Sequence, residues 1–434
     1  MLLVTLPPAP PLFRRSEGPI RGAGPGPVRP RDLLARAGLP TGGLFWLAIG
    51  LSACSVLAGA SLAPGLVEIA RALGAEGAVW PRLLVSLPAL GVPLGALAFT
   101  RFGAGLPERA VLLFAVLLYA AAGAAGALLG VPGPMLALRM LQGMTIAPMM
   151  LIALRWLGAG QDPRGALALQ SVLITGSTVA VLLASGLMAG IDWRLPFALN
   201  LAPLALIPAI LTLAPAGAAR PATAAAAAAP AEPAPAPGPQ AGAYLPGLIL
   251  AFVAMASFFA VPTQIAGALA ALGGASAPRA AILIILSVTA AALSGIALRR
   301  AEMPRQTSVL VIAGFAAQAL GFWQLALGGS VWMAMSGAAL VGAGFGAIFP
   351  TLNHWAMAGR FGMGPGRAIA GITAAFHIGQ FAAPLLGAAA LRTDGGIAVF
   401  VPYLLLALFG AGLARAEAAR LDAALSPAAR VPAQ

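Results

Sequence analysis

Long apolar runs separated by short polar segments are the dominant pattern along the chain. Twelve of these runs are long enough to cross a bilayer as helices, since about 20 apolar residues span its hydrocarbon core. The first half holds the runs at 44–66, 83–100, 110–130, 135–157, 166–190 and 196–214. The second half holds the runs at 245–270, 280–298, 307–328, 331–357, 367–390 and 396–414. The pattern predicts an all-α polytopic membrane protein with twelve transmembrane helices in two six-helix bundles.

The segments outside these runs divide the chain into domains. Residues 1–41 are rich in proline and arginine, and residues 215–243 are an Ala/Pro tract without the large apolar side chains that a core needs. We therefore expect five parts in order along the chain. They are a disordered cytoplasmic N-terminal tail at 1–41, an N-terminal bundle at 42–214, a cytoplasmic linker at 215–243, a C-terminal bundle at 244–414 and a cytoplasmic tail at 415–434.

Composition supports the membrane class and sets the orientation. The 434 residues are 60% hydrophobic and only 9% charged, whereas soluble domains carry about 25% charged residues. The net charge of +13 comes from arginines that are spread between the apolar runs, so it indicates topology and no nucleic-acid partner. Most arginines fall on one side if the N-terminus is inside, which predicts that both termini are cytoplasmic.

Residues with catalytic or metal-binding chemistry are scarce. Cys54 is the only cysteine and the chain has two histidines, so we expect neither a disulfide framework nor a metal centre. No nucleophile–base–acid set is visible in the sequence. We therefore expect that the protein is not an enzyme and has no cofactor, and that its partners are a small-molecule substrate and the lipid bilayer.

Arg139 is the only arginine well inside an apolar run. An arginine there costs about 2.5–3.5 kcal/mol on insertion scales, so it should face protein or water and not lipid. Gln142 and Gly143 share its helix face, and Gly143 with Ala147 forms a small-residue strip that lets another helix approach. Two interpretations stay open: an interhelical hydrogen-bond anchor, or a polar patch that lines a transport cavity.

The second half offers other polar candidates. His377 lies ~15 Å from the cytoplasmic end of its helix, near the bilayer midplane, and Gln380 follows one turn later. An imidazole there could carry a proton, or it could stay neutral and donate one hydrogen bond between helices. Gln264 is a candidate for a helix contact or for the cavity. None of the 12 acidic residues lies deep in a run, and Glu68 comes closest.

Glycines and prolines inside the later runs predict sites where helices bend. Pro262 and Pro350 each free a backbone carbonyl that a neighbour or a cavity must satisfy. Pro350 with Gly344 and Gly346 makes its helix a candidate bending element, and a kink that serves packing alone is the alternative.

The two halves of the chain repeat one another in sequence. Pro163-Arg164-Gly165-Ala166 opens the fifth run, and Pro365-Gly366-Arg367-Ala368 opens the eleventh. Further along the same runs, Gly176-x-x-x-Ala180 matches Gly379-x-x-x-Ala383. Six helices repeated in parallel are typical of two bundles that flank a central substrate path.

Two motifs resemble those of the major facilitator superfamily of secondary transporters. Arg139-x-x-Gln142-Gly143-x-x-x-Ala147 is similar to the family's fourth-helix motif, which implies that Arg139 helps couple ion and substrate movement. The stretch from Gly95 through Arg101 and Gly103, with Arg109 beyond, resembles the family's cytoplasmic gating loop. The resemblance implies ion pairs between the domains at these arginines, although Phe99 or Thr100 stands where the family has an aspartate.

The later helices, including the stretch at 258–264, resemble those of bacterial sugar-efflux and drug-efflux permeases. This resemblance implies an antiporter of the bacterial inner membrane that couples efflux of a small organic molecule to the proton gradient by alternating access. We expect that the protein is a monomer. A neutral or anionic amphiphile fits the fixed charge of Arg139 better than a cationic drug does. The alternatives are uptake of a small metabolite, or a transporter-like sensor or scaffold that does not transport.

Overall fold

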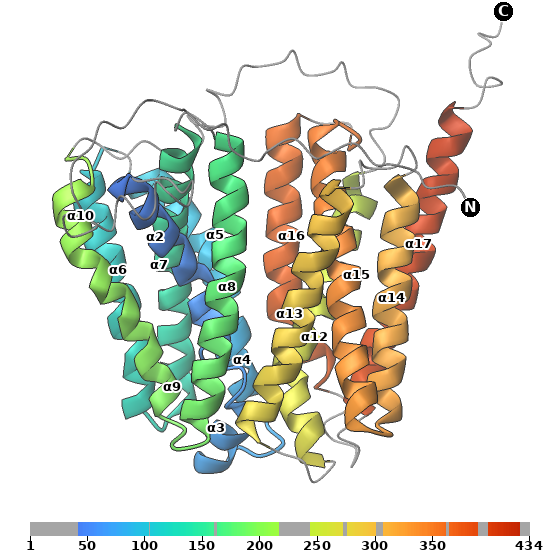
Figure 1. The fold of residues 1–434 in the computed structure, drawn as a ribbon, viewed down its shortest axis with the longest axis horizontal. Coiled ribbons are helices and arrows are strands. Elements are labelled where there is room, and N and C mark those ends of the chain that lie inside the picture. The colour runs from blue at the N-terminus through green and yellow to red at the C-terminus, as the bar shows by residue number, and fades with distance from the viewer. Residues whose placement is uncertain are drawn as a thin grey trace, which may run out of the picture.

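The computed structural model describes residues 42–103, 105–159, 163–216, 244–271, 276–300, 307–361, 364–388 and 398–425. In this part of the chain the helices form two side-by-side bundles, one from each half of the sequence (Figure 1). The expected N-terminal tail, nearly all of the expected linker and the last residues of the chain lie outside the described residues.

The helices follow the predicted runs closely. The first bundle consists of α2 Gly43–Ala60, α3 Leu66–Ala72, α4 Trp80–Ser86, α5 Pro88–Ala98, η1 Phe99–Gly103, α6 Glu108–Ala125, η2 Gly126–Leu128, α7 Pro132–Gly158, α8 Pro163–Ala189, α9 Leu195–Ala198, η3 Leu199–Leu206 and α10 Ile207–Leu213. The second bundle consists of α12 Tyr244–Ala271, α13 Ala277–Arg300, α14 Thr307–Leu327, α15 Val331–Met357, α16 Pro365–Leu386, η6 Ala398–Phe400 and α17 Val401–Leu425. The last helix thus continues past Ala414 into the first part of the predicted tail at 415–434.

The described residues contain 11 helices that could each span a membrane, and up to 12 if one bent pair counts as a span. The bent pair is α4 and α5, which meet at an angle of 43°. The predicted run at 83–100 is therefore a broken helix. Its break lies at Leu87, because Pro88 has no N–H to continue the helical hydrogen bonds at this point.

Local sequence signals place the starts of several helices. Pro132 and Pro365 occupy the first turns of α7 and α16, where the missing N–H would have no helical partner anyway. Ser330 caps α15 by accepting a hydrogen bond from the backbone N–H of Met333 at 3.2 Å, as N-cap serines do.

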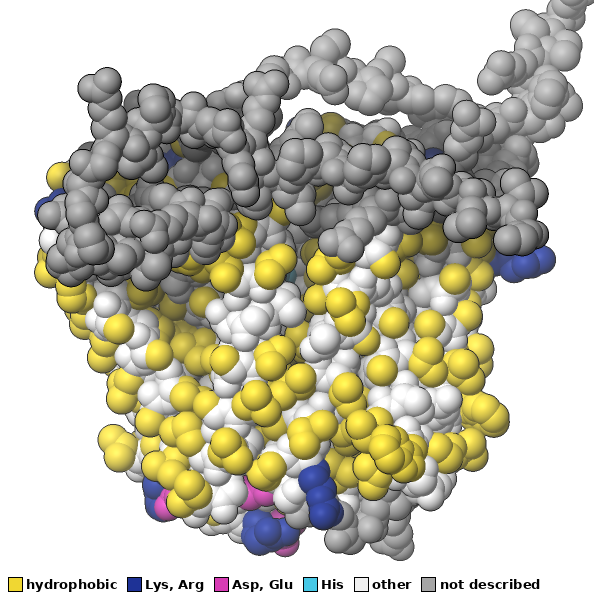
Figure 2. All heavy atoms as spheres, viewed as in Figure 1, with side chains coloured by type: hydrophobic (Ala, Val, Ile, Leu, Met, Phe, Trp, Pro, Cys, Tyr) yellow, Lys and Arg dark blue, Asp and Glu magenta, His cyan; other side chains and the backbone are white. Residues whose placement is uncertain are grey.

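The outside of the bundles is apolar between two polar ends. On the face that Figure 2 shows, hydrophobic side chains cover the middle of the molecule, and the coloured charged side chains gather toward its ends. Large exposed side chains on this outer surface include Leu97, Phe114, Leu293 and Leu405. An exposed apolar belt of this kind is what a lipid-facing surface requires.

Glycines let one pair of helices in each bundle cross at close range. A Cβ on Gly143 of α7 would lie 2.1 Å from the Pro88 carbonyl oxygen of α5. In the second bundle, a Cβ on Gly342 of α15 would lie 1.9 Å from the Ser287 carbonyl oxygen of α13. Both distances are far inside van der Waals contact, so only glycine permits these crossings.

The hydrophobic cores differ between the two ends of the molecule. At the end predicted to be outside, one cluster of buried residues joins both bundles, with Leu66 and Leu84 from the first and Val261 and Leu283 from the second. At the end predicted to be cytoplasmic, each bundle has a core of its own. Leu112 and Met149 belong to the first of these cores, and Leu352 belongs to the second. The bundles are therefore packed together at one end and separately cored at the other.

Candidate functional site

The candidate site is a buried polar network around Arg139 in the first bundle. The Arg139 side chain is 1% exposed and donates to three acceptors from three directions. Its Nε lies 2.6 Å from the Leu84 carbonyl oxygen, its Nη1 lies 2.5 Å from Oε1 of Gln142, and its Nη2 donates to the Ala58 carbonyl oxygen. The planar guanidinium thus connects α7 with α2 and α4.

Both main-chain acceptors of Arg139 lie where a helix is interrupted. The carbonyl of Leu84 would normally bond the N–H of residue 88, but Pro88 has none. The carbonyl of Ala58 lies in the last turn of α2, where carbonyl groups lack partners within the helix. A buried carbonyl without a partner costs about 1–3 kcal/mol. Arg139 therefore satisfies two acceptors that the breaks in α2 and in the α4–α5 pair leave unpaired.

The network continues beyond the arginine. Nε2 of Gln142 donates to Oδ1 of Asn200 at 2.7 Å, and Nδ2 of Asn200 donates to the Phe197 carbonyl oxygen at 3.1 Å. The Ser185 hydroxyl donates to the Ser61 carbonyl oxygen at 2.6 Å, in the turn that follows α2. Asn200 is fully buried, and its place in the network is a feature that the sequence analysis did not identify.

In this conformation, the surroundings of Arg139 are those of an interhelical hydrogen-bond anchor. A side chain that lined an aqueous cavity would be exposed to it, whereas Arg139 is enclosed by protein acceptors. The geometry is that of an interhelical anchor whose charge is stabilised by carbonyl dipoles. Gly143, one turn further on, brings the backbones of α5 and α7 close enough for these bonds to form.

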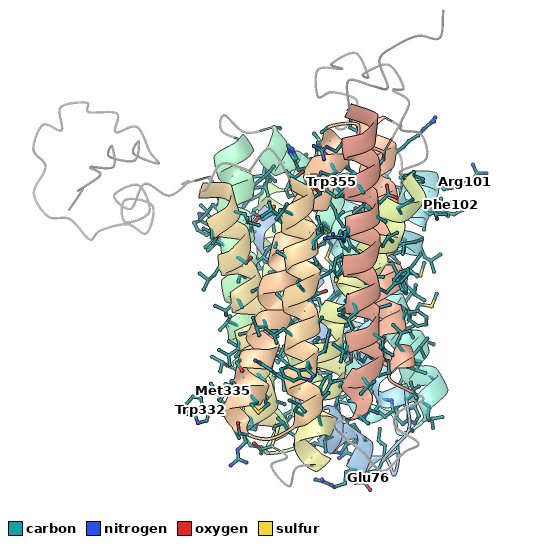
Figure 3. The ribbon with its side chains drawn as sticks, turned by 90° about the vertical axis from the view of Figure 1, so that its right-hand side faces the viewer. Glu76, Arg101, Phe102, Trp332, Met335 and Trp355 are labelled. Atoms are coloured by element: carbon teal, nitrogen blue, oxygen red, sulfur yellow. The ribbon has the colours of Figure 1, made fainter. Side chains whose placement is uncertain are left out.

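The predicted gating residues occupy different surroundings. Gly95 lies within α5, where a Cβ would approach the Met144 carbonyl oxygen of α7 to 2.0 Å, so it is a packing position. Arg101 lies in η1, and its exposed side chain points away from the helices (Figure 3). A Cβ on Gly103 would lie 2.3 Å from the Phe99 ring. Nη2 of Arg109 donates to the Ala214 carbonyl oxygen at 3.0 Å, a contact within the first bundle.

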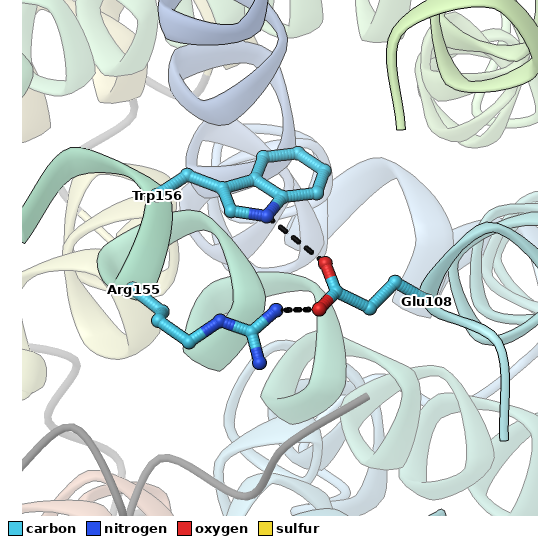
Figure 4. A network of polar contacts seen from close by, with 3 residues as sticks. All are labelled: Glu108, Arg155 and Trp156. Carbon is cyan, nitrogen blue, oxygen red and sulfur yellow. Dashed lines mark hydrogen bonds and ion pairs between the residues drawn. The ribbon is translucent and has the colours of Figure 1, made fainter. Parts of the chain in front are cut away.

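Glu108 supplies a carboxylate close to the predicted gating loop. Glu108 accepts from Nη2 of Arg155 and, at 3.0 Å, from Nε1 of Trp156 (Figure 4). These contacts join the start of α6 to the last turns of α7. The family's aspartate is absent from the chain, but an acid paired with an arginine is present close by. Its partner was hard to predict because Glu108 and Arg155 are far apart in sequence.

The candidates of the second half do not join the Arg139 network. Nδ1 of His377 lies 2.7 Å from the Thr373 carbonyl oxygen one turn earlier in α16, which makes this nitrogen the protonated one. Gln380, on the same helix, is partly buried. Nε2 of Gln264 donates to the Tyr403 hydroxyl at 3.0 Å, and this hydroxyl donates to the Ala383 carbonyl oxygen. Gln264 thus makes a helix contact inside the second bundle.

The predicted bending positions lie in continuous helices. α12 runs through Pro262 and α15 runs through Pro350 as single elements. A Cβ on Gly344 would lie 2.3 Å from the Gly314 carbonyl oxygen, and one on Gly346 would lie 2.1 Å from the Ala291 carbonyl oxygen. In this conformation both glycines serve close helix packing. Among the described residues, no group of three or more metal-ligating side chains comes together.

Comparison with known proteins gives a consistent result for the fold. Neither a family model nor a curated protein sequence matches the chain at a significant level. The solved structure of a point mutant of the nucleoside transporter NupG matches 88% of this chain and 100% of its own with a TM-score of 0.64 at 14% identity. A bacterial homologue of the human lysosomal transporter Spinster, in an inward-facing and occupied conformation, matches 88% of this chain and 98% of its own with a TM-score of 0.63 at 16% identity.

A third match extends the comparison. The xylose transporter XylE from E. coli, in a partially occluded inward-open conformation, matches 85% of this chain and 97% of its own with a TM-score of 0.58 at 13% identity. The chain therefore shares its all-α fold with these three solved transporters, and this is the fold class that the twelve apolar runs predict. The three proteins are transporters by description.

Proposed function

We propose that the protein is a secondary active transporter that moves a small organic molecule across a bacterial inner membrane by alternating access. In this mechanism the two bundles rock about a site between them, so that one end is closed while the other is open. We propose that the protein acts as a monomer, with both termini in the cytoplasm, and that the proton gradient drives it.

The observation that carries this proposal is the difference between the two ends of the molecule. A single hydrophobic core joins the bundles at the predicted outer end, while the predicted cytoplasmic end has two separate cores. A protein built as one rigid body would have no reason to divide its core at one end. The arrangement fits the inward-facing state of a rocking pair, which also describes two of the three solved transporters above.

Arg139 has a structural part in this mechanism. It holds the last turn of α2 and the break between α4 and α5 against α7, and α3 and α4 lie in the shared outer core. We infer that Arg139 couples movement of the outer ends of these helices to the rest of the first bundle. Its length and three-way hydrogen bonding suit this role better than direct contact with substrate.

We also propose a direction of transport, which is export. The resemblance of the later helices to efflux permeases favours export in exchange for protons, with His377 as a candidate carrier. Among the described residues, Asp and Glu lie outside the middle of the membrane-spanning segments, and α12 and α16 carry neither. A neutral or anionic amphiphile therefore remains the proposed substrate class.

Purified protein in liposomes tests the proposal. A ligand is first found by thermal shift in a library of metabolites and drugs. The liposomes are then loaded with this ligand, and a pH gradient is imposed with the acidic side either inside or outside. Export predicts that substrate moves against its gradient only when protons move the opposite way. Accumulation in the same direction as protons would instead support uptake. A ligand that stabilises the protein but never crosses the bilayer would support the sensor or scaffold alternative.

A further inference from the structure

Glu68 lies where the first bundle meets the second at the predicted outer end. It is in α3, which follows the turn at the end of α2 and packs against α12 and α13 of the second bundle. With Arg71, Asp192 and Trp193 it lines a pocket of about 350 Å³. Residues on either side of it in sequence, Leu66 and Ile69, belong to the hydrophobic core that joins the bundles.

The carboxylate of Glu68 makes a contact across the bundles. It faces the backbone N–H of Ala277, the first residue of α13. The N-terminus of a helix carries partial positive charge, so it attracts a carboxylate. Close packing of α8 on the same helix start holds α13 in place, since a Cβ on Gly186 would lie 2.7 Å from the Ala281 Cβ.

The second carboxylate oxygen has a different environment. Oε2 of Glu68 is buried and has no hydrogen-bond partner. A charged oxygen without a partner is costly in such a place, whereas the protonated form carries less charge to solvate. Burial raises the pKa of Glu68, and the nearby backbone N–H groups of Glu68 and Ala277, together with the charge of Arg71, lower it by less.

Other charged groups surround this position. Arg71 is paired with the exposed Glu76 at 3.4 Å, and Asp192 accepts from the backbone N–H of Arg194 at 2.8 Å. From the other packed elements, α13 contributes Arg279 and α4 contributes Arg82, while α12 carries no charged residue. Glu68 is the acid among these whose surroundings change most if the bundles separate, because its contact with Ala277 crosses between them.

We propose that Glu68 is a protonation-sensitive latch, which takes up a proton when the outer end closes and releases it when the outer end opens. This inference rests on the proposed alternating-access function. Opening would expose the carboxylate to water and bring its pKa back toward the ordinary value of a glutamate. Since the closed state then holds the proton more tightly than the open state, acid outside favours the closed outer end.

A cysteine reporter in the outer core measures this equilibrium without transport. Ala266 of α12 is 5% exposed and belongs to the shared core, so Ala266→Cys should react with a membrane-impermeant maleimide only when the outer end opens. The background carries Cys54→Ala. Leu128→Cys, at an outer-end position that is 87% exposed, corrects for the effect of pH on the maleimide reaction and verifies the orientation.

The expected result is slower labelling of Ala266→Cys as the outer pH falls. The ratio of corrected rates can reach about tenfold for each unit by which the Glu68 pKa differs between the two states. Glu68→Gln, which cannot lose a proton, should label slowly at every pH. Glu76→Gln is the matched control, because this glutamate is at the same end but exposed, and it should keep the pH dependence of the parent.

Three results would overturn the latch. They are faster labelling at low pH, no pH dependence in the parent, or a pH dependence that survives Glu68→Gln. If the pH dependence then disappears in Asp192→Asn, Asp192 is the titrating group. If Glu68→Gln does not fold, Glu68→Ala must also abolish the pH dependence. If the protein transports but labelling of Ala266→Cys does not depend on pH, the latch is rejected and the proposed function stands. If labelling depends on pH but the protein does not transport, the proposed function is rejected and the latch stands.

Discussion

The two bundles share a helix crossing but differ in what surrounds it. Gly143 lies on Pro88 in the first bundle and Gly342 lies on Ser287 in the second, with the same spacing along the chain for both pairs. That spacing places Ala338, a buried alanine of α15, at the position equivalent to Arg139. The second bundle therefore forms the same crossing without a charge.

The helices next to the crossing explain the difference. In the first bundle, Pro88 interrupts the α4–α5 pair and α2 ends at Ala60, so carbonyls of Leu84 and Ala58 need a donor from elsewhere. In the second bundle, Ser287 replaces the proline and α13 continues through it, while α12 is also unbroken. An arginine is thus required by the broken helices of the first bundle and not by the crossing itself.

Replacing Arg139 is the strongest test of this comparison. Arg139→Ala leaves the buried carbonyls of Leu84 and Ala58 and the amide of Gln142 without their donor, so we expect a loss of about 3–5 kcal/mol in the free energy of unfolding. Transport should be abolished. Unfolding in detergent and uptake or release in liposomes measure the two effects. Arg101→Ala, at an exposed arginine, should change stability by less than about 0.5 kcal/mol.

Arg139→Lys separates anchoring from coupling. Lysine keeps the charge but loses the planar fork that reaches several acceptors at once. An anchor that only maintains packing predicts that stability and transport fall in parallel. If Arg139 couples the outer helices to substrate movement, the lysine variant should fold and bind ligand yet fail to accumulate it against a gradient. Full transport by a well-folded Arg139→Ala protein would contradict both roles.

The sequence predicts much of this architecture and little of the network. Period and length of the apolar runs locate the helices, because a membrane span must be long, apolar and helical. Arg139 with Gln142 is predictable because the two residues are one turn apart. The partners Ala58, Leu84 and Asn200 are not, since main-chain acceptors leave no chemical signal in the sequence and their proximity depends on how separate helices pack. Gly95 illustrates the converse, because its motif indicates a gate whereas its contacts are those of close packing.

Adding one methyl group to each crossing tests whether the bundles are equivalent there. Gly143→Ala and Gly342→Ala would place a Cβ 2.1 Å and 1.9 Å from a backbone oxygen. Because a backbone cannot move as a side chain can, each substitution should separate its helix pair and cost about 1–3 kcal/mol. Thermal unfolding in detergent would measure both. Gly176→Ala is the control, since nothing lies within 4 Å of a Cβ at that position. A large loss in only one bundle would show that the crossings are not equivalent.

The buried glutamines should differ between the bundles. Gln142 accepts from Arg139 and donates to Asn200, so Gln142→Leu leaves a charged donor and an amide unsatisfied and should cost about 2 kcal/mol. Gln264 donates to Tyr403, but its Oε1 has no partner, so Gln264→Leu removes an unsatisfied oxygen together with one hydrogen bond. Its cost should stay below about 1 kcal/mol. Equal losses in unfolding free energy would contradict the view that the polar network is confined to the first bundle.

The smallest expected effect concerns the predicted cytoplasmic end of the first bundle. Glu108 joins α6 to α7 through Arg155 and Trp156, whereas the Trp355 indole of the second bundle donates to the neutral Thr307 hydroxyl at 2.7 Å. Glu108→Gln keeps the shape and one acceptor but loses the charge, so it should cost about 1 kcal/mol. Thr307→Val removes the neutral acceptor and should cost a similar amount, because the indole N–H is left unpaired. If Glu108 also takes part in gating, Glu108→Gln will slow transport by more than its stability loss explains, and Thr307→Val will not. Transport rates of the two variants at matched folded fractions decide between these outcomes.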